Sequence, residues 1–585
     1  MPHRNYLFSL RFAHALRATF SAEPYTRQRF FQDLFAGTTV GIIAIPLAMA
    51  LAVASGVEPQ YGLYTAIIAG FIIALSGGSL YSVSGPTAAF VVILYPIAQS
   101  FGLAGLLVAT VMSGFILVMM ALLRLGRYIQ YIPESVVLGF TGGIAVVIVI
   151  LQIKDLFGLP IDAMPESFFE KMQVLLEMAP QIHWPSLAIS ALTLGIIIVW
   201  SRTNSRIPAQ LPAMIIASFA GIALAYYDMP VDTIGTRFSY MLPDGGIGEG
   251  IAPVLPHFEW PWQRVGVAGN APVWGWSTIQ ALLPSALAIA MLGAIESLLC
   301  AVVLDGMSGK RHSANSELLG QGIGNIIAPF FGGITATAAL ARSAANFRAG
   351  AYSPIAAMIH SLLVLLGLVA LSRLLSYMPM PAMASLLLFV AWRMSEAPKS
   401  LHLLKTAPLS DIAIFLTCFL LTVMFDMVVA ISTGMVLAAL LFMKEIADMT
   451  RVSEITRSNR FVPEGAPEGW RVVKISGPLF FAAADRVFGD IAAQHLGERG
   501  TILYLDGVPV LDAGGLSALE RLMHKCAKEK SFLMLTDLQF QPLKTLARAG
   551  IAPRAGEFAL YPSLADALTA AHLAQAREVP DLGSL

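Results

Sequence analysis

Cysteine and charged residues are both scarce in this sequence. The chain of 585 residues contains 3 cysteines, Cys300, Cys418 and Cys526, which lie far apart. Their isolation argues against a disulfide framework and against a CxxC metal or redox motif. Only 13% of the residues are charged and 56% are hydrophobic, whereas a soluble domain carries about 25% charged residues. Most of the chain is therefore predicted to lie in a lipid bilayer.

Motifs for nucleotide hydrolysis and for metal chemistry are also lacking. The stretch 306–310, Gly-Met-Ser-Gly-Lys, has neither the spacing of a phosphate-binding P-loop nor the Ser or Thr that follows its lysine. No HExxH or GxSxG motif occurs, and the 10 histidines are scattered. We therefore expect no enzyme, no bound metal or cofactor and no nucleic-acid partner. If the chain moves a solute, an ion gradient has to drive the movement.

Hydrophobic segments dominate residues 31–448. A helix that spans a bilayer needs about 20 apolar residues, and a half-helix needs fewer. The sequence predicts a polytopic α-helical membrane protein with fourteen segments in two sets of seven. The first set lies near 33–55, 62–77, 86–100, 103–123, 131–153, 185–200 and 208–227, and the second near 277–304, 314–331, 337–349, 353–375, 379–393, 409–426 and 427–446.

The positions of lysine and arginine predict the orientation of these segments. Basic residues gather in every second loop, and the arginine-rich residues 1–30 fall on the same side. The long loop 228–276 falls on the other side and is acidic. By the positive-inside rule the basic side is cytosolic. Both termini are therefore expected in the cytosol, with residues 1–30 as a cytosolic lead-in.

Two of the segments are interrupted by small and hydroxyl residues at mid-membrane depth. The interruptions lie at 83–90 and 332–339, and each is expected to resume as a shorter apolar helix. Irregular backbone is tolerated at that depth only where protein buries it or a polar cavity meets it. Broken segments at equivalent positions of two halves mark the binding site in many transporters. Because helix N-termini attract anions, the breaks predict an anion site.

Three side chains near the breaks are candidates for transport chemistry. Glu296 lies near the middle of an apolar span, where a carboxyl group has to be protonated or paired. It is interpreted as a proton-coupling residue, with a static structural pair or a hydrogen bond to backbone as the alternative. Arg342 could contact a substrate, hold Glu296 or reach the cytosolic interface. Thr87 could donate a hydrogen bond or simply cap a helix, and we favour backbone N–H groups of the breaks as the main anion ligands.

The composition becomes that of a soluble domain after about residue 455. Strand patterns alternate there with helical patterns, which is typical of a small α/β domain. Residues 449–469 are rich in charged residues, proline and glycine. They are predicted to be a linker between a transport domain, 31–448, and the α/β domain, 470–578.

Several runs of the sequence resemble the signatures of SulP anion transporters. These runs are 59–66 with 77–79, 33–41 with Ile45-Pro46, and 315–322, while the C-terminal domain resembles STAS, the cytosolic module of this family. The resemblance implies a seven-plus-seven inverted repeat with core and gate domains, a homodimer and an elevator-like motion of the core. It also implies a substrate site between the N-termini of segments 3 and 10. The residues that it assigns there are Ile45, Pro46, Leu47, Thr87, Ala88, Glu296, Ala339, Leu340, Ala341 and Arg342.

The substrate expectation comes from the resemblance and from one departure. The resemblance is strongest to C4-dicarboxylate transporters of bacteria, which implies proton-coupled symport of succinate, fumarate or aspartate across the bacterial inner membrane. Leu47 stands where sulfate-type members often carry Gln, and a less polar wall favours a substrate with an apolar middle. A sulfate or bicarbonate symporter driven by protons or sodium is the alternative, and a non-transporting STAS-linked sensor or scaffold is the third reading.

The C-terminal domain departs from its relatives at one regulatory position. Ala513 stands where phospho-switch STAS domains carry serine. A phosphoserine switch of that type is therefore excluded, and regulation through a cytosolic protein partner stays open.

Overall fold

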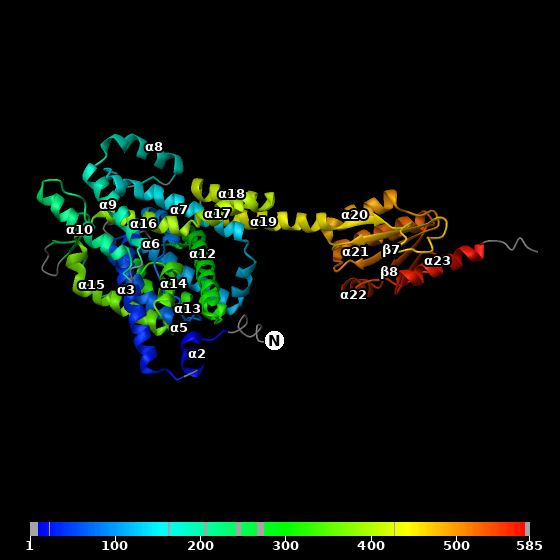
Figure 1. Ribbon diagram of the computed structural model, residues 1–585, viewed down its shortest axis with the longest axis horizontal. Helices are drawn as coiled ribbons and strands as arrows, with labels where there is room; N and C mark the ends of the chain where they lie inside the picture. Colours follow the sequence, from blue (N-terminus) through cyan, green and yellow to red (C-terminus); the bar gives the residue numbers. More distant parts are fainter. Residues whose placement is uncertain are drawn as a thin grey trace, which may run out of the picture. The chain divides into compact units, whose positions relative to one another are not determined.

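The computed structural model describes residues 10–22, 24–161, 164–165, 167–203, 207–241, 247–265, 274–425 and 427–578. They form two compact units, Met1–Met435 and Val436–Leu585. The first is a bundle of helices, and the second is built on a β-sheet, as Figure 1 shows. Both chain ends, which the sequence places in the cytosol, lie outside the described residues.

The first unit contains two groups of packed helices. The first group consists of α3 (Arg27–Ala54), α4 (Pro59–Tyr64), α5 (Gly70–Ser76), α6 (Ala88–Leu122), α12 (Trp276–Ser308), α13 (Ala314–Ile327), α14 (Leu340–Arg348) and α15 (Ile355–Leu375). In this group α3 packs on α15 and α4, and α6 packs on α12 and α13. Glycine permits the closest approach, since a Cβ atom on Gly62 would lie 2.0 Å from the carbonyl oxygen of Ala48. Small residues at such contacts are typical of helices that pack in membranes.

The second group is organised around α7. Its members are α7 (Glu134–Phe157), α9 (Trp184–Ser201), α10 (Gln210–Tyr226), α16 (Met380–Met394), α18 (Leu409–Met424) and the first residues of α19 (Met427–Met449), a helix that continues into the second unit. α7 packs against α9, α16 and α18. Four short helices complete the inventory, namely α2 (His14–Ala22), α8 (Phe168–Met178), α11 (Ile234–Arg237) and α17 (Ala397–Thr406).

Helices occur at each of the fourteen expected segments. Eight helical stretches are long and apolar enough to span a membrane, and α10 and α18 are shorter apolar helices, within the part of the chain that the structure describes. α6 covers two expected segments, and Gly102, with φ 65° and ψ −170°, interrupts the helix between them. α14 differs from the expectation because it buries Arg342, Ser343 and Asn346. It is a short polar half-helix and not an apolar one.

The loop 228–276 connects the two helix groups at one end of the bundle. Arg237 of α11 donates a hydrogen bond from Nη1 to Oδ1 of Asp155, near the end of α7, at 2.5 Å. Farther along the loop, the N–H of Glu259 donates to the carbonyl oxygen of Phe330 at 2.8 Å. Phe330 belongs to η5 (Ala328–Phe331), which directly follows α13 of the first group. The described part of the loop is therefore attached to both groups.

The second unit is an α/β domain, as the sequence predicts. Its sheet has the order β5-β6-β7-β8-β9, in which the first pair is antiparallel and the others are parallel. The strands are β5 (Arg451–Glu454), β6 (Trp470–Ser476), β7 (Gly500–Gly507), β8 (Phe532–Thr536) and β9 (Phe558–Tyr561). The helices around the sheet in Figure 1 are α20 (Phe481–Gln494), α21 (Ala513–Lys528), α22 (Phe540–Arg548) and α23 (Leu564–Glu578). The first three share one apolar core, and α23 packs into another.

The structure corrects the prediction that 449–469 is a linker. This stretch contains β5, and its Ile455 and Val462 are buried in the core with α23. β5 escaped detection because it is an edge strand with mostly exposed residues. Arg486 of α20 also donates from Nη2 to the carbonyl oxygen of Ala447, near the end of α19, at 2.9 Å. Unpaired carbonyl groups and a partial negative charge at a helix C-terminus favour such a cation.

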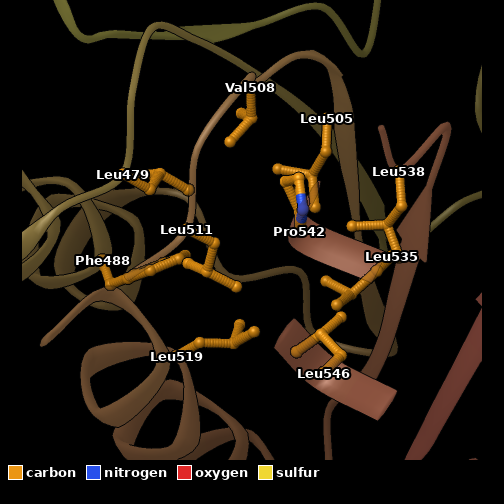
Figure 2. A pocket seen from close by; sticks show the side chains of 10 residues that line it. All are labelled: Leu479, Phe488, Leu505, Val508, Leu511, Leu519, Leu535, Leu538, Pro542 and Leu546. Atoms are coloured by element: carbon orange, nitrogen blue, oxygen red, sulfur yellow. The ribbon is translucent and has the colours of Figure 1, made fainter. Parts of the chain in front are cut away.

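The core of the α/β domain contains a small void. Figure 2 shows ten side chains around it, among them Leu479, Leu511 and Pro542, and all ten are apolar. The void has a volume of about 10 Å³, which is about the space of one water molecule. It is a packing defect and not a ligand site.

Candidate functional site

The two breaks predicted from the sequence lie side by side in the first unit. Their central residues form two short strands, β1 (Ser84–Gly85) and β4 (Thr337–Ala338), which pair antiparallel. The contact continues at Val83, whose N–H donates to Oγ of Ser343 at 2.9 Å and whose carbonyl oxygen accepts from the N–H of Ala339 at 3.0 Å. Segments more than 250 residues apart therefore form one buried structure.

Both half-helices begin beside these strands without a side-chain cap. α6 begins after Thr87 and α14 after Ala339, and neither of these N-cap residues makes a side-chain hydrogen bond to the first turn. The first N–H groups of a helix have no partner within the helix. Together with the positive end of the helix dipole they attract an anion. The paired strands bring the two helix starts to one place.

Arg342 extends from α14 to the first break. It is 3% exposed, and its Nη2 donates to the carbonyl oxygen of Pro86 at 2.6 Å. Within the described part of the chain, its Nε and Nη1 atoms are buried without a hydrogen-bond partner. A Cβ atom on Gly85 would lie 2.8 Å from Nη1, so the guanidinium would have to shift to make room for a side chain there. Burial contradicts the alternative in which this side chain reaches the cytosolic interface.

Glu296 of α12 is joined to the first break by Thr87. The Thr87 hydroxyl donates to Oε2 of Glu296 at 2.9 Å, so it does not cap α6. Glu296 is half-buried and Thr87 is buried. No ion pair joins Glu296 to Arg342 among the described residues, although the two side chains lie close enough to interact electrostatically. The carboxyl group thus contacts the start of α6 and keeps some access to its surroundings.

One helix holds both breaks in place, and the sequence reasoning missed it. On α13, Oε2 of Glu317 accepts hydrogen bonds from the N–H groups of Gly78 and Ser79, both at 2.9 Å, ahead of the first break. Two turns later, the amide of Asn325 accepts from the N–H of Ala336 at 2.8 Å and donates to its carbonyl oxygen at 2.9 Å. The sequence did contain a signal for this role, namely a carboxyl group and amide groups within the expected spanning segment 314–331. Polar side chains at membrane depth are functional by default.

The other predicted site residues are apolar. α14 packs against α3, which carries three of them. They are Ile45, Pro46 and Ala88, which are buried, Leu47 and Ala339, which are half-buried, and Leu340 and Ala341, which are exposed. These positions offer apolar surface near the breaks but no polar side chain.

The arrangement is suited to binding an anion. It offers two uncapped helix starts, a buried guanidinium with two unpartnered nitrogen atoms and one carboxyl group that can carry a proton. Within the described ranges no group of three or more His, Cys, Asp or Glu side chains could hold a metal ion. Glu296 is linked to the start of α6 by its hydrogen bond with Thr87.

Comparisons with known proteins agree with this architecture. Residues 30–418 match the family described as the sulfate permease family, and residues 464–567 match the STAS domain. The chain is 35% identical over 535 residues to "Putative sulfate transporter YvdB" of Bacillus subtilis (strain 168), a match that covers 91% of this chain and 96% of the relative.

Solved structures extend the likeness to three dimensions. The transmembrane domain of a cyanobacterium bicarbonate transporter BicA is 28% identical, with a TM-score of 0.60, over 69% of this chain and 98% of that chain. The murine Slc26a9 anion transporter in its inward-facing state is 18% identical, with a TM-score of 0.80, over 95% and 94% of the two chains. The second likeness shows the fold alone.

Proposed function

The chain belongs to the sulfate permease family, and from this premise we propose that it is a secondary active, proton-coupled symporter of C4-dicarboxylates such as succinate, fumarate or aspartate. Family membership makes it a multi-pass membrane transporter of anions with a C-terminal STAS domain, and not an enzyme. The substrate and the coupling ion are the parts that we propose.

Arg342 is the observation on which the proposal mainly rests. A buried guanidinium with two unpartnered nitrogen atoms leaves hydrogen-bonding capacity unused, and an unsatisfied charged group inside a protein is costly. A carboxylate oxygen or another oxyanion oxygen would satisfy it with a charge-assisted hydrogen bond. The uncapped starts of α6 and α14 add backbone N–H donors for the same anion.

Glu296 provides the proposed coupling to protons. A carboxylate substrate and an ionised Glu296 would repel each other in a site of low dielectric constant. Protonation removes this repulsion, and Thr87 can still donate to Oε2 when the proton lies on Oε1. The loaded site would then move with one proton, in an elevator-like motion of the first helix group against the second.

The apolar residues near the breaks favour an organic dianion. Leu47 is half-buried and Leu340 is exposed, so both retain accessible apolar surface. Such surface suits the methylene or methine centre of a C4-dicarboxylate better than the uniformly polar surface of sulfate. Bicarbonate or sulfate symport with protons or sodium is the second candidate, favoured by the names of the relatives.

The remaining assignments follow the same proposal. We place the protein in the bacterial inner membrane as a homodimer with both termini in the cytosol. Residues 31–448 would form the transport domain and the STAS domain would meet a cytosolic protein partner. A STAS-linked sensor that transports nothing is the third reading.

Uptake into liposomes by the purified full-length protein tests the proposal. Labelled succinate, bicarbonate and sulfate are offered separately, with the outside either at the internal pH or made acidic. We expect succinate uptake that accelerates under the inward proton gradient. Succinate uptake that ignores the gradient would overturn the coupling, uptake of bicarbonate or sulfate alone would reverse the substrate order, and no uptake of any anion would favour the sensor.

A further inference from the structure

A groove lined by both polar and apolar side chains lies in the second helix group. It has a volume of about 530 Å³ and is bounded by the first turns of α7 and α18 and by the short helix α17. Apolar side chains such as Leu138 and Leu403 form part of its wall. A volume of this size falls within the range of small-molecule sites, roughly 300–1,000 Å³.

The groove carries negative charge on one side and basic groups on the other. Glu134 and Asp411 stand in the first turns of α7 and α18, and the Ser135 hydroxyl donates to Oδ1 of Asp411 at 3.2 Å. Lys399 and His402 face them from α17. A ligand with one positive and one negative group would be complementary to this wall.

Lys399 keeps its positive charge at neutral pH. Its ammonium group contacts the Glu396 carboxylate, three residues earlier in the chain. This hydrogen bond raises the pKa of Lys399, although some burial acts in the opposite direction. Because the lysine side chain is 64% exposed, it can also donate to a ligand in the groove.

The surroundings of the groove are those of a membrane surface. It lies at the end of the helix group where basic residues predict the cytosolic side, and α17 is a surface helix without a buried residue. Around it Trp392 is 66% exposed, Leu401 57% and Leu409 84%. Exposed tryptophan and leucine beside lysine are typical of segments at the depth of lipid headgroups.

We propose that this groove binds the headgroup of a phospholipid that carries a primary amine, of the phosphatidylethanolamine type. The ammonium group would meet Glu134 and Asp411, and the phosphate would meet Lys399 and His402. An anionic headgroup would bring no positive group to the two carboxylates, and a choline headgroup has no N–H to donate to them. The shared chemistry, a primary ammonium beside a phosphate, also occurs in soluble phosphoethanolamine.

Thermal melting and lipid titration of the detergent-purified full-length protein test the proposal. The probes are phosphatidylethanolamine, phosphatidylglycerol and phosphatidylcholine with identical acyl chains, and phosphoethanolamine. A lipid that binds only the folded state raises the melting temperature. We expect the ethanolamine lipid to bind at least about tenfold more tightly than the other two, which corresponds to about 1.4 kcal/mol. Equal effects of the three lipids would overturn the proposal.

Matched variants assign the effect to the groove. Glu134→Gln and Lys399→Gln should each reduce the preference for the ethanolamine lipid about tenfold while the weak effect of the choline lipid, which reports the integrity of the fold, stays. Glu170→Gln on α8 and Lys405→Gln on α17 make the same charge changes outside the groove and should keep the preference. A preference that survives both groove variants would contradict the site. Equal stabilisation by soluble phosphoethanolamine would overturn the lipid assignment in favour of a free zwitterion.

Discussion

Replacing Asn325 with alanine should disturb the second break more than any other single hydrogen-bond deletion on α13. The Asn325 amide pairs with both backbone groups of Ala336, at 2.8 and 2.9 Å, and both residues are fully buried. Leaving a buried donor or acceptor unpaired costs about 1–3 kcal/mol. Nε2 of Gln321 lies 3.4 Å from the Ala336 carbonyl oxygen and would partly replace one contact. We therefore expect a loss of roughly 2–4 kcal/mol in the free energy of unfolding.

The expected consequence for transport follows from the position of Ala336. It lies directly before β4, so a shift of this residue would move the start of α14. We expect the Michaelis constant for the anion to rise while protein that stays folded keeps a measurable maximal rate. Denaturant unfolding in detergent and initial uptake rates in liposomes would measure the two effects.

Asn346→Ala is the matched control for this substitution. It removes the same amide from α14, where Nδ2 of the Asn346 side chain donates a hydrogen bond to the carbonyl oxygen of Tyr81 at 3.1 Å. The loss of stability should be about 1–3 kcal/mol, smaller than for Asn325→Ala. Equal losses for the two variants, or an unchanged Michaelis constant for Asn325→Ala, would refute the positioning role.

Three further predictions follow from single residues. Glu296→Gln should abolish the acceleration of uptake by an acidic exterior, and a gradient response equal to that of the unchanged protein would show that another group carries the proton. Asp33→Asn should lower the free energy of unfolding by about 1.5–3 kcal/mol, because Oδ2 of the fully buried carboxylate accepts hydrogen bonds from the hydroxyls of Tyr25 and Ser353, and an amide NH2 group cannot accept them. An unchanged free energy in denaturant unfolding would contradict this. Burial raises the pKa of Cys526 to about 11, so iodoacetamide at pH 8 should modify this thiol only after the protein unfolds. Mass spectrometry would measure the modification, and rapid labelling of Cys526 in the folded protein would contradict the prediction.

The sequence predicted the elements and the breaks because their signals are local. Apolar length locates the helices, and glycine, proline and hydroxyl residues mark both breaks. The pairing of the breaks, with Val83 against Ser343, could not be predicted since it joins segments 260 residues apart. The same limit concealed Glu317 and Asn325, whose partners lie on other elements. For the same reason the sequence could not say which group Arg342 contacts. The folded structure shows that its guanidinium reaches the carbonyl oxygen of Pro86.

Local composition also misled the prediction in two places. Charged and proline-rich residues concealed the edge strand β5 in the expected linker, because edge residues need not be apolar. α14 was expected to be apolar, yet its buried face carries an arginine, a serine and an asparagine that bind the other break. In both cases the sequence of the segment does not reveal which other segment it packs against, and that partner determines its structure.

The dissociation constant of succinate for Arg342 variants tests the central claim most directly. Calorimetric titration at fixed pH would compare the unchanged protein with Arg342→Ala, Arg342→Lys and, as a control on an exposed arginine of α15, Arg373→Ala. Hydrogen bonds to charged groups contribute about 1.5–3 kcal/mol, so Arg342→Ala should weaken binding roughly 10- to 100-fold. Arg342→Lys should recover part of it, since lysine keeps the charge but not the fork. Succinate binding that is equally tight in Arg342→Ala and Arg373→Ala, with the fold intact by melting, would contradict an anion site at the two breaks.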